Sequence, residues 1–318
     1  MSPSLRRIRI GTRGSALARW QAEHVAAALG ELPGAPDAEL VLIRTEGDRI
    51  QDVPLSQMQG KAFFTKEIEE ALLADRVDVA VHSLKDLATA MPAGLRLGAV
   101  MKREDPRDAL LLAPSLPEGT LETLPRGSRV GTGSLRRRAL LAHLRPDLEL
   151  LDLRGNVPTR IRKLDRGEYD AIVLAAAGVK RLGLHHRIST LLDPGTFVPA
   201  VSQGAIGVQV RDEDDPVASW VAKLEDTGAR VATAAERAFL RRVEGGCKVP
   251  VGAFGRLEEN GLGLRGVICS LDGRRRVTGE RRGSPEEAES MGTSLAEELL
   301  RGGGEEILEA IRGENVGE

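Results

Sequence analysis

One cysteine of the chain stands in a segment whose composition could support covalent chemistry. Cys247 is one of only two cysteines among 318 residues, and it follows two glycines in the stretch from Glu244 to Lys248. The stretch has neither helical nor strand periodicity, so we predict a tight loop whose glycines leave the sulfur accessible. The neighbouring lysine favours the thiolate, which is the reactive form of cysteine. Cys247 is therefore a candidate nucleophile or attachment point, and an inert, buried thiol is the alternative.

A second group of residues consists of cations placed where predicted strands end or predicted helices begin. Helix N-termini attract anions, and ligands of open α/β sheets bind beyond the carboxyl ends of the strands. Arginine adds a planar fork that binds both oxygens of a carboxylate or phosphate. We therefore predict a cleft for a multiply anionic ligand. Its candidate residues are Arg13, Lys61, Lys85, Arg136, Arg137, Arg154 and Arg160.

The first half of the chain repeats a pattern of strand, loop and helix. A strand at 6–10 leads into a Gly-Thr-Arg-Gly turn, after which Ser15 is the expected N-cap of a helix to Leu29. The apolar run 40–43 predicts a strand that is covered on both faces. A helix at 63–74 and a strand at 78–81 follow. The end of that strand would carry Lys85 and Asp86.

The second half shows the same pattern again, so we expect two βαβ halves. Gly131-Thr132-Gly133-Ser134 matches the first turn and cap, and further strands are expected at 148–151 and 170–174. The segment 197–210 is interpreted as a crossing that returns the chain to the first domain and adds a strand there. The run from Arg126 to Arg166 holds eleven Lys or Arg against four Asp or Glu, which indicates either a solvated face or an anion site.

The last part of the chain predicts a small α+β domain with an antiparallel sheet. A helix at 232–242 precedes the Cys247 loop, and strands are expected at 253–257, 262–270 and 275–283. Asn260-Gly261 and Asp272-Gly273 are strong hairpin signals between them. Cys269 is interpreted as a core residue of the middle strand. The predicted fold class is thus α/β, with two βαβ domains around a cleft and a three-stranded C-terminal sheet. The predicted domains are 1–102 with 203–223, 106–199, and 227–318.

Composition excludes several classes of protein. The net charge is −2 and aromatic residues make up 3% of the chain, which disfavours a nucleic-acid binder with stacking platforms. No run of about 18 apolar residues and no leader segment is visible, so neither a membrane span nor secretion is expected. Two distant cysteines fit a reducing cytoplasm, and no Cys/His cluster has the spacing of a metal site.

Six short motifs together make a more specific pattern than any one of them. They are Gly11-Thr12-Arg13-Gly14-Ser15, Val81-His82-Ser83-Leu84-Lys85-Asp86, Arg103-Glu104-Asp105-Pro106-Arg107-Asp108, Leu135-Arg136-Arg137, Leu153-Arg154-Gly155-Asn156-Val157 and Glu244-Gly245-Gly246-Cys247. Six motifs in this order, between Ile8 and Ile311, resemble those of the porphobilinogen deaminase family, also called hydroxymethylbilane synthases.

This resemblance implies a fold and a reaction. The first two domains would be folded like periplasmic binding proteins, and the third would carry the cofactor. The enzyme would be a transferase of tetrapyrrole biosynthesis that joins four porphobilinogens head to tail, with loss of ammonia, to give hydroxymethylbilane. A dipyrromethane cofactor, built and retained by the enzyme, would be attached through a thioether to Cys247. We expect a cytoplasmic monomer that binds porphobilinogen and has no nucleic-acid, membrane or obligate protein partner.

The cations fit such a substrate, because each porphobilinogen brings an acetate and a propionate. Loss of ammonia leaves positive charge at the pyrrole nitrogen, which a buried carboxylate would stabilise. Asp86 matches the catalytic aspartate of the family. The cofactor-binding residues implied by the resemblance are Ser83, Lys85, Thr132, Ser134, Arg136 and Arg137. The substrate-binding residues implied are Arg13, Ser15, Gln21, Lys61, Arg154, Arg160, Arg181 and Gln203.

Three single residues and the segment Gln57-Met58-Gln59 before Gly60-Lys61 depart from the usual pattern of the family. Gly133 stands where serine is usual, Ala88 where proline is usual, and Ser202 where glycine is usual. None of these departures removes a charged group. The alternatives to the deaminase are a non-catalytic anion-binding protein with two lobes, a nucleic-acid binder and a thiol hydrolase. The first leaves Cys247 without a role, and no motif supports the histidine that the last requires.

Overall fold

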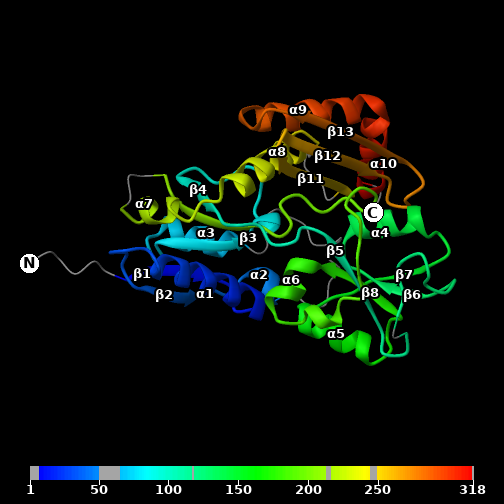
Figure 1. Cartoon of the computed structure of the whole chain (residues 1–318), viewed down its shortest axis with the longest axis horizontal. Helices are drawn as coiled ribbons and strands as arrows, with labels where there is room; N and C mark the ends of the chain where they lie inside the picture. Colours follow the sequence, from blue (N-terminus) through cyan, green and yellow to red (C-terminus); the bar gives the residue numbers. More distant parts are fainter. Residues whose placement is uncertain (1–6, 50–64, 117, 213–215, 244–248, 317–318) are drawn as a thin grey trace, which may run out of the picture. The chain divides into compact units, whose positions relative to one another are not determined.

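The computed structural model describes residues 7–49, 65–116, 118–212, 216–243 and 249–316 (Figure 1). The described residues form three sheets. They divide into two compact units, the first within Met1–Asp52, Gln59–Glu104 and Gly204–Arg230, and the second within Asp105–Gln203 and Val231–Glu318. No helix in these ranges combines the length and apolar character needed to span a membrane.

The first unit is built on a mixed sheet of five strands in the order β2-β1-β3-β10-β4. Its strands are β1 (Ile8–Thr12), β2 (Ala38–Leu42), β3 (Val79–Ser83), β4 (Leu95–Val100) and β10 (Ile206–Arg211). The first three strands are parallel to one another, whereas β10 runs antiparallel to both β3 and β4. The chain therefore returns to this sheet after building the second one, as the segment 197–210 predicts.

Helices pack against the five-stranded sheet of the first unit and complete its hydrophobic cores. They are α1 (Ala16–Gly30), α2 (Glu46–Arg49), α3 (Lys66–Leu73), the 3₁₀ turn η1 (Leu84–Asp86) and α7 (Pro216–Ala222). Val25 of α1 packs with the β1 and β3 strands through Ile10 and Val79, and Ile68 of α3 belongs to a separate buried cluster. The helices α1, α3 and α7 thus bury apolar residues against the sheet.

The second unit repeats this design with a sheet in the order β7-β6-β8-β5-β9. Its strands are β5 (Asp108–Leu112), β6 (Arg129–Gly131), β7 (Glu149–Leu151), β8 (Ala171–Ala175) and β9 (Thr190–Leu191). Its helices are α4 (Leu135–Leu144), α5 (Val157–Asp165), α6 (Ala176–Arg181) and the turn η2 (His185–Arg187). As in the first sheet, the first strand of the repeat lies between the second and third, to which it is parallel.

The C-terminal sheet completes the second unit. It consists of β11 (Val251–Glu258), β12 (Gly261–Cys269) and β13 (Arg276–Gly283), all antiparallel. Its helical elements are α8 (Thr227–Val243), η3 (Pro285–Glu287), α9 (Ala288–Leu299), the π-helical η4 (Leu300–Gly304) and α10 (Glu305–Val316). Leu264 and Ile268 of β12 face a core with Phe239 of α8 and Leu295 of α9.

The opposite face of β12 joins the core of the second five-stranded sheet. Val267 and Cys269 belong to one buried cluster with Leu140 of α4 and Phe197. Cys269 has no exposed surface, so its predicted place in the core is confirmed. The alternation of side chains along β12 explains this arrangement, because successive residues of a strand point to opposite faces.

The predicted α/β class, with two βαβ sheets and a three-stranded antiparallel C-terminal sheet, is confirmed, with differences in detail. We did not predict the strands β4, β5 and β9 from the sequence. Our prediction followed the repeated pattern of a strand followed by a helix, and these three strands do not fit it. The strand predicted at 40–43 packs on both faces, since Leu40 contacts one buried cluster and Val41 and Ile43 contact another. This strand, β2, nevertheless lies at the edge of its sheet, and Leu42 is 53% exposed.

Candidate functional site

A small pocket in the first unit gathers predicted site residues from separate parts of the chain. The cavity has a volume of about 80 Å³. It is lined by Arg13, Ser15, Leu17, Ala18, Gln21, Thr65, Val81, His82, Ser83 and Asp86. Five of these, Arg13, Ser15, Gln21, Ser83 and Asp86, are residues that the sequence analysis assigns to the site. They come from the turn before α1, from α1 itself, and from the carboxyl end of β3.

The parallel pairing of β1 and β3 explains why these residues meet. Both strands end at the same edge of the sheet, so the turn that follows β1 lies near η1, which follows β3. The Ser15 hydroxyl accepts a hydrogen bond from the Ala18 amide at 3.3 Å, which confirms Ser15 as an N-cap. Gln21 Nε2 then donates to Ser83 Oγ at 2.9 Å and ties α1 to β3.

The charged groups of this pocket differ in burial. The carboxyl-bearing residue Asp86 is exposed, and so is Lys85, whereas Arg13 is partly buried. Sequence reasoning expected a buried carboxylate, and in the described residues of the first unit Asp86 is open to water instead. A carboxylate at an open pocket edge is accessible to a cationic ligand.

His82 lines the same pocket, although no role is predicted for it from its sequence context. His82 Nε2 lies 3.1 Å from Gln209 Oε1, and Gln209 Nε2 donates to Glu69 Oε1 at 3.0 Å. These partners are 127 and 140 residues apart in sequence, so no local spacing could have predicted them. Burial lowers the pKa of His82 to about 4, and the charge of Arg13 acts in the same direction.

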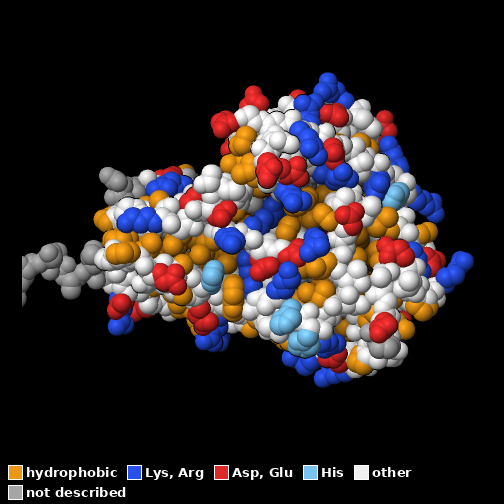
Figure 2. Space-filling view, viewed as in Figure 1, with side chains coloured by type: hydrophobic (Ala, Val, Ile, Leu, Met, Phe, Trp, Pro, Cys, Tyr) orange, Lys and Arg blue, Asp and Glu red, His pale blue; other side chains and the backbone are white. Residues whose placement is uncertain are grey.

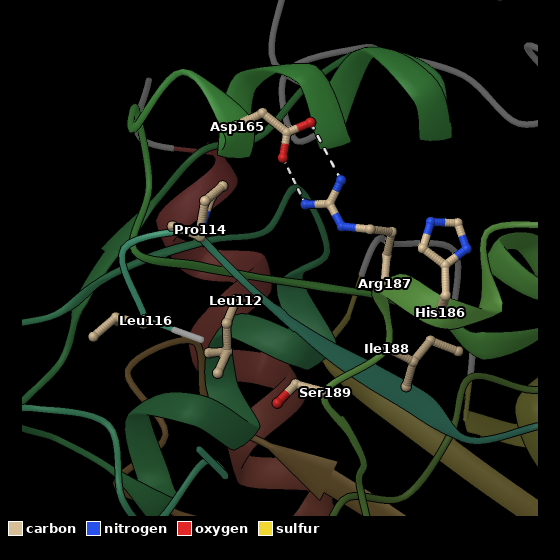
Figure 3. A pocket seen from close by; sticks show the side chains of 9 residues that line it. Leu112, Pro114, Leu116, Asp165, His186, Arg187, Ile188 and Ser189 are labelled. Carbon is tan, nitrogen blue, oxygen red and sulfur yellow. Dashed lines mark hydrogen bonds and ion pairs between the residues drawn. The ribbon is translucent and has the colours of Figure 1, made fainter. Parts of the chain in front are cut away.

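Volume alone does not identify the site. A larger cavity of about 570 Å³ lies in the second unit, between the end of β5 and the η2 turn (Figure 3). Leu112, Leu116 and Ile188 give it apolar walls, and an ion pair between Arg187 and Asp165 lies on its rim. None of the predicted site residues lines it.

In the second unit, the predicted cofactor-binding arginines belong to a buried ion cluster. Arg136 and Arg137 are only 4% and 6% exposed, and each lies 2.8 Å from a carboxylate oxygen of Asp108. Arg136 Nη1 also donates to the Val198 carbonyl at 2.7 Å. Gln203 Nε2 donates to Asp108 Oδ1 at 2.9 Å. Asp108 lies within one of the six motifs, but no local pattern predicts its role as the shared counter-ion.

This cluster fits a ligand that carries carboxylates. Burial would raise the pKa of Asp108, but the charges of Arg136 and Arg137 lower it, so the carboxylate is ionised. Two guanidiniums then share one carboxylate, which leaves an excess positive charge, and the buried Nε of Arg136 has no hydrogen-bond partner within the described structure. An unbalanced buried charge and an unpaired N–H donor both favour a bound anion.

The turn before α4 lies beside these arginines and contains two more predicted cofactor-binding residues. Ser134 is the N-cap of α4 and accepts from the Arg137 amide at 3.4 Å, while Thr132 Oγ1 accepts from the Ser134 amide at 3.3 Å. A Cβ added to Gly133 would lie 2.8 Å from the Leu153 carbonyl oxygen. The glycine at this position is therefore required by the close approach of the backbone after β7.

The remaining predicted cations lie at element ends of the second unit. Arg160 of α5 donates through Nε to the Gly155 carbonyl at 2.7 Å, and Arg154 precedes that helix. Arg181 is the last residue of α6. Arg154 and Arg160 thus lie at the N-terminal end of α5, as we predicted. Cys247 and Lys61 lie outside the described residues.

A further departure from the usual family pattern has a structural cost. Ser202 has φ of 60°, the left-handed conformation that favours glycine, and its buried hydroxyl has no hydrogen-bond partner within the described structure. Its amide donates to Glu236 Oε2 at 2.5 Å, which holds the turn in place. The next residue, Gln203, contacts Asp108, so this strained turn positions a residue of the buried ion cluster.

Asp108→Asn is expected to lower the free energy of unfolding by about 3–5 kcal/mol at pH 7, because it leaves two buried guanidiniums without their carboxylate. The lowered pKa of Asp108 means that its stabilisation is present above the ordinary aspartate value near ~4 and is lost as the pH falls. The difference between variant and parent should therefore shrink in acid. Urea unfolding followed by circular dichroism at several pH values measures both effects.

The matched control is Asp165→Asn, which breaks the more exposed pair with Arg187. This change should cost less than about 1 kcal/mol. Equal effects of the two substitutions would contradict the assignment of Asp108 as a buried, ionised partner of both arginines.

Two family profiles together match nearly the whole chain. The family profile described as "Porphobilinogen deaminase, dipyromethane cofactor binding domain" matches residues 8–219, and "Porphobilinogen deaminase, C-terminal domain" matches residues 231–301. Among solved structures, an ancestral arginine-binding protein bound to arginine is similar with a TM-score of 0.37 and 16% identity, over 69% of this chain and 90% of that one. Similarity at that level carries no argument.

Curated relatives are much more similar. "Porphobilinogen deaminase" of Roseiflexus castenholzii (strain DSM 13941 / HLO8) is 52% identical over 94% of this chain and 97% of its own length. The protein of the same name from Syntrophobacter fumaroxidans (strain DSM 10017 / MPOB) is 48% identical over 96% of this chain and 97% of its own. The chain therefore belongs to the porphobilinogen deaminase family, and it is an enzyme of the hydroxymethylbilane synthase class with a dipyrromethane cofactor.

Proposed function

We propose that this enzyme joins four porphobilinogens head to tail, releases one ammonia for each, and frees hydroxymethylbilane by hydrolysis. In each coupling, the bond between the aminomethyl carbon and nitrogen of the incoming porphobilinogen breaks. That carbon then bonds to the free α-carbon of a terminal pyrrole, which loses a proton. The observation that carries this proposal is the meeting of five predicted site residues in one pocket of a chain that belongs to this family.

The cofactor supplies the terminal pyrrole on which the product is built, and we propose that it is held through a thioether to Cys247. The residues proposed to hold its carboxylates are Ser83, Lys85, Thr132, Ser134, Arg136 and Arg137. The buried cluster of Arg136, Arg137 and Asp108 supports this assignment, because its excess positive charge matches a carboxylate. The α4 N-terminus adds backbone N–H groups that favour the same charge.

Arg13 and Ser15 are proposed to bind the carboxylates of the incoming porphobilinogen in the pocket of the first unit. Gln21 positions Ser83 there through its hydrogen bond. Arg154, Arg160, Arg181, Lys61 and Gln203 complete the proposed set for substrate. Each porphobilinogen that joins the growing oligopyrrole adds two carboxylates. A set of dispersed cations therefore suits this ligand, whose negative charge increases during the reaction.

Asp86 is the proposed catalytic residue. When ammonia leaves, positive charge develops at the pyrrole nitrogen of the substrate, and a fixed carboxylate stabilises it. The same carboxylate can accept and return a proton during coupling. Its place beside Arg13 in the pocket supports this role, since the guanidinium would hold the substrate's carboxylate while Asp86 meets its ring nitrogen.

Family membership disfavours the alternative of a non-catalytic anion-binding protein. A nucleic-acid surface is also disfavoured, because Lys and Arg side chains are interspersed with Asp and Glu on the face shown in Figure 2.

We further propose that the enzyme works as a cytoplasmic monomer. Within the described residues, no group of three or more His, Cys, Asp or Glu side chains could hold a metal ion.

The direct test of the reaction is its stoichiometry. Purified enzyme incubated with porphobilinogen should release one ammonia per porphobilinogen consumed and one hydroxymethylbilane per four. Ammonia and trapped product are measured in the same sample by enzymatic assay and by liquid chromatography with mass detection. Consumption of porphobilinogen without ammonia, or a product of another length, would contradict the proposed polymerisation.

A further inference from the structure

A buried chain of three polar side chains runs from α3 through β10 to the pocket that holds Asp86. We call it the Glu69–Gln209–His82 relay. Its hydrogen bonds are 3.0 Å between Gln209 Nε2 and Glu69 Oε1, and 3.1 Å between Gln209 Oε1 and His82 Nε2. Gln209 has no exposed surface, and the other two residues are each 5% exposed. Neither the family motifs nor the proposed reaction gives these side chains a role.

The chemistry of the relay determines its direction. The carboxylate of Glu69 only accepts hydrogen bonds, so the amide of Gln209 must turn its NH₂ group toward Glu69. The carbonyl oxygen of Gln209 then faces His82, and only an N–H group can pair with it. His82 must therefore carry a hydrogen on Nε2.

The ring of His82 is also uncharged. Burial lowers the pKa of His82 to about 4, Arg13 lowers it further, and the hydrogen bond to Gln209 opposes both only in part. A neutral imidazole protonated on Nε2 has a lone pair on Nδ1, which is a hydrogen-bond acceptor. The charged residues around His82 and its pocket come from three elements. They are Arg13 from the turn before α1, Glu69 from α3 and Asp86 from η1.

We propose that Glu69 and Gln209 are positioning residues that hold His82 as the neutral Nε2–H tautomer, so that Nδ1 accepts a hydrogen bond from an N–H group of the bound porphobilinogen. This inference rests on the proposed role of Asp86. A neutral acceptor that holds the aminomethyl group leaves the single N–H of the pyrrole ring to pair with the Asp86 carboxylate. A cationic ring at the same place would compete with that nitrogen for Asp86 and would repel the developing charge.

The first test needs no substitution. Long-range ¹H–¹⁵N correlation spectra of histidine-labelled holoenzyme distinguish the two neutral tautomers and the imidazolium. The chain has five histidines, and the His82 signal is assigned by its loss in His82→Gln or by eliminating the other four. We expect a neutral ring protonated on Nε2 at pH 7. A ring protonated on Nδ1, or a charged ring, would overturn the proposal.

The second test is Glu69→Gln, which keeps the shape of the side chain but lets it donate as well as accept. Gln209 can then turn over, and His82 should populate both tautomers. We expect kcat to fall roughly tenfold through lost orientation, with KM nearly unchanged. A shift in tautomer without loss of kcat would refute the catalytic importance of the relay, and an unchanged tautomer would refute the relay itself.

Glu70→Gln is the matched control, because Glu70 is the next residue of α3 and is exposed, 4.0 Å from Lys66. It should leave the tautomer, kcat and melting temperature unchanged. The outcomes also separate this inference from the proposed function. If Asp86→Asn is fully active while Glu69→Gln changes the tautomer, the role of Asp86 is wrong and the structural relay stands.

Discussion

Asp86→Asn is expected to lower kcat by roughly 10²–10⁴-fold, the usual contribution of a positioned acid–base group. Asparagine keeps the size of the side chain and its hydrogen bonds but carries no negative charge. The positive charge that develops at the substrate's pyrrole nitrogen would then lack its counter-ion. Because Asp86 is exposed at the pocket, the fold should tolerate the change. Initial rates of porphobilinogen consumption, with the melting temperature, test this expectation.

The control for this prediction is Asp212→Asn, another exposed aspartate of the first unit that lies outside the pocket. It should keep nearly full activity. Intact-mass measurement should show that the Asp86→Asn protein still carries its cofactor, so that the loss belongs to turnover. Near-normal kcat in Asp86→Asn would remove Asp86 from the catalytic role.

Cys247→Ala is expected to abolish both the covalent cofactor and turnover. The proposed thioether requires the sulfur, and alanine has no atom that could replace it. Intact-mass spectrometry of the parent should show a species heavier by two linked pyrroles, and the variant should have the mass of the bare chain. Activity without any covalent addition in the parent protein would refute the attachment role.

Cys269→Ala is the matched control, because it removes the other cysteine. Cys269 is fully buried in β12, and burial raises the pKa of its thiol to about 11, so little thiolate forms near neutral pH. The variant should keep the added mass and the activity. It should lose about 1–2 kcal/mol of stability, as expected for a small cavity in a core. Loss of the adduct in this variant instead would move the attachment to Cys269.

Local sequence predicts the parts of the site that depend on neighbouring residues. Ser15 and Ser134 cap their helices as expected, since an N-cap is formed by a side chain and an amide three residues later. The hairpins of the C-terminal sheet follow from Asn260-Gly261 and Asp272-Gly273 for the same reason. The return of the chain at β10 was predicted from its apolar segment, although its antiparallel direction was not.

Other parts of the site depend on which strands become neighbours. Asp108 begins β5, a strand that our reading of the repeat missed, so its pairing with Arg136 and Arg137 could not be foreseen. The exposure of Leu42 depends on β2 being an edge strand. Periodicity reports which face of an element is apolar, but it carries no information on what covers that face.

The sequence by itself determined the family, the capped turns and the positions of most cations proposed to bind carboxylates. Only the tertiary structure showed that Arg13, Gln21 and Asp86 line one pocket, and that two arginines share one buried carboxylate. It alone revealed the relay from Glu69 through Gln209 to His82. The physical reason is that such contacts join residues far apart in sequence, 62 positions for Gln21 and Ser83 and 140 for Glu69 and Gln209, and sheet order rather than local propensity brings them together.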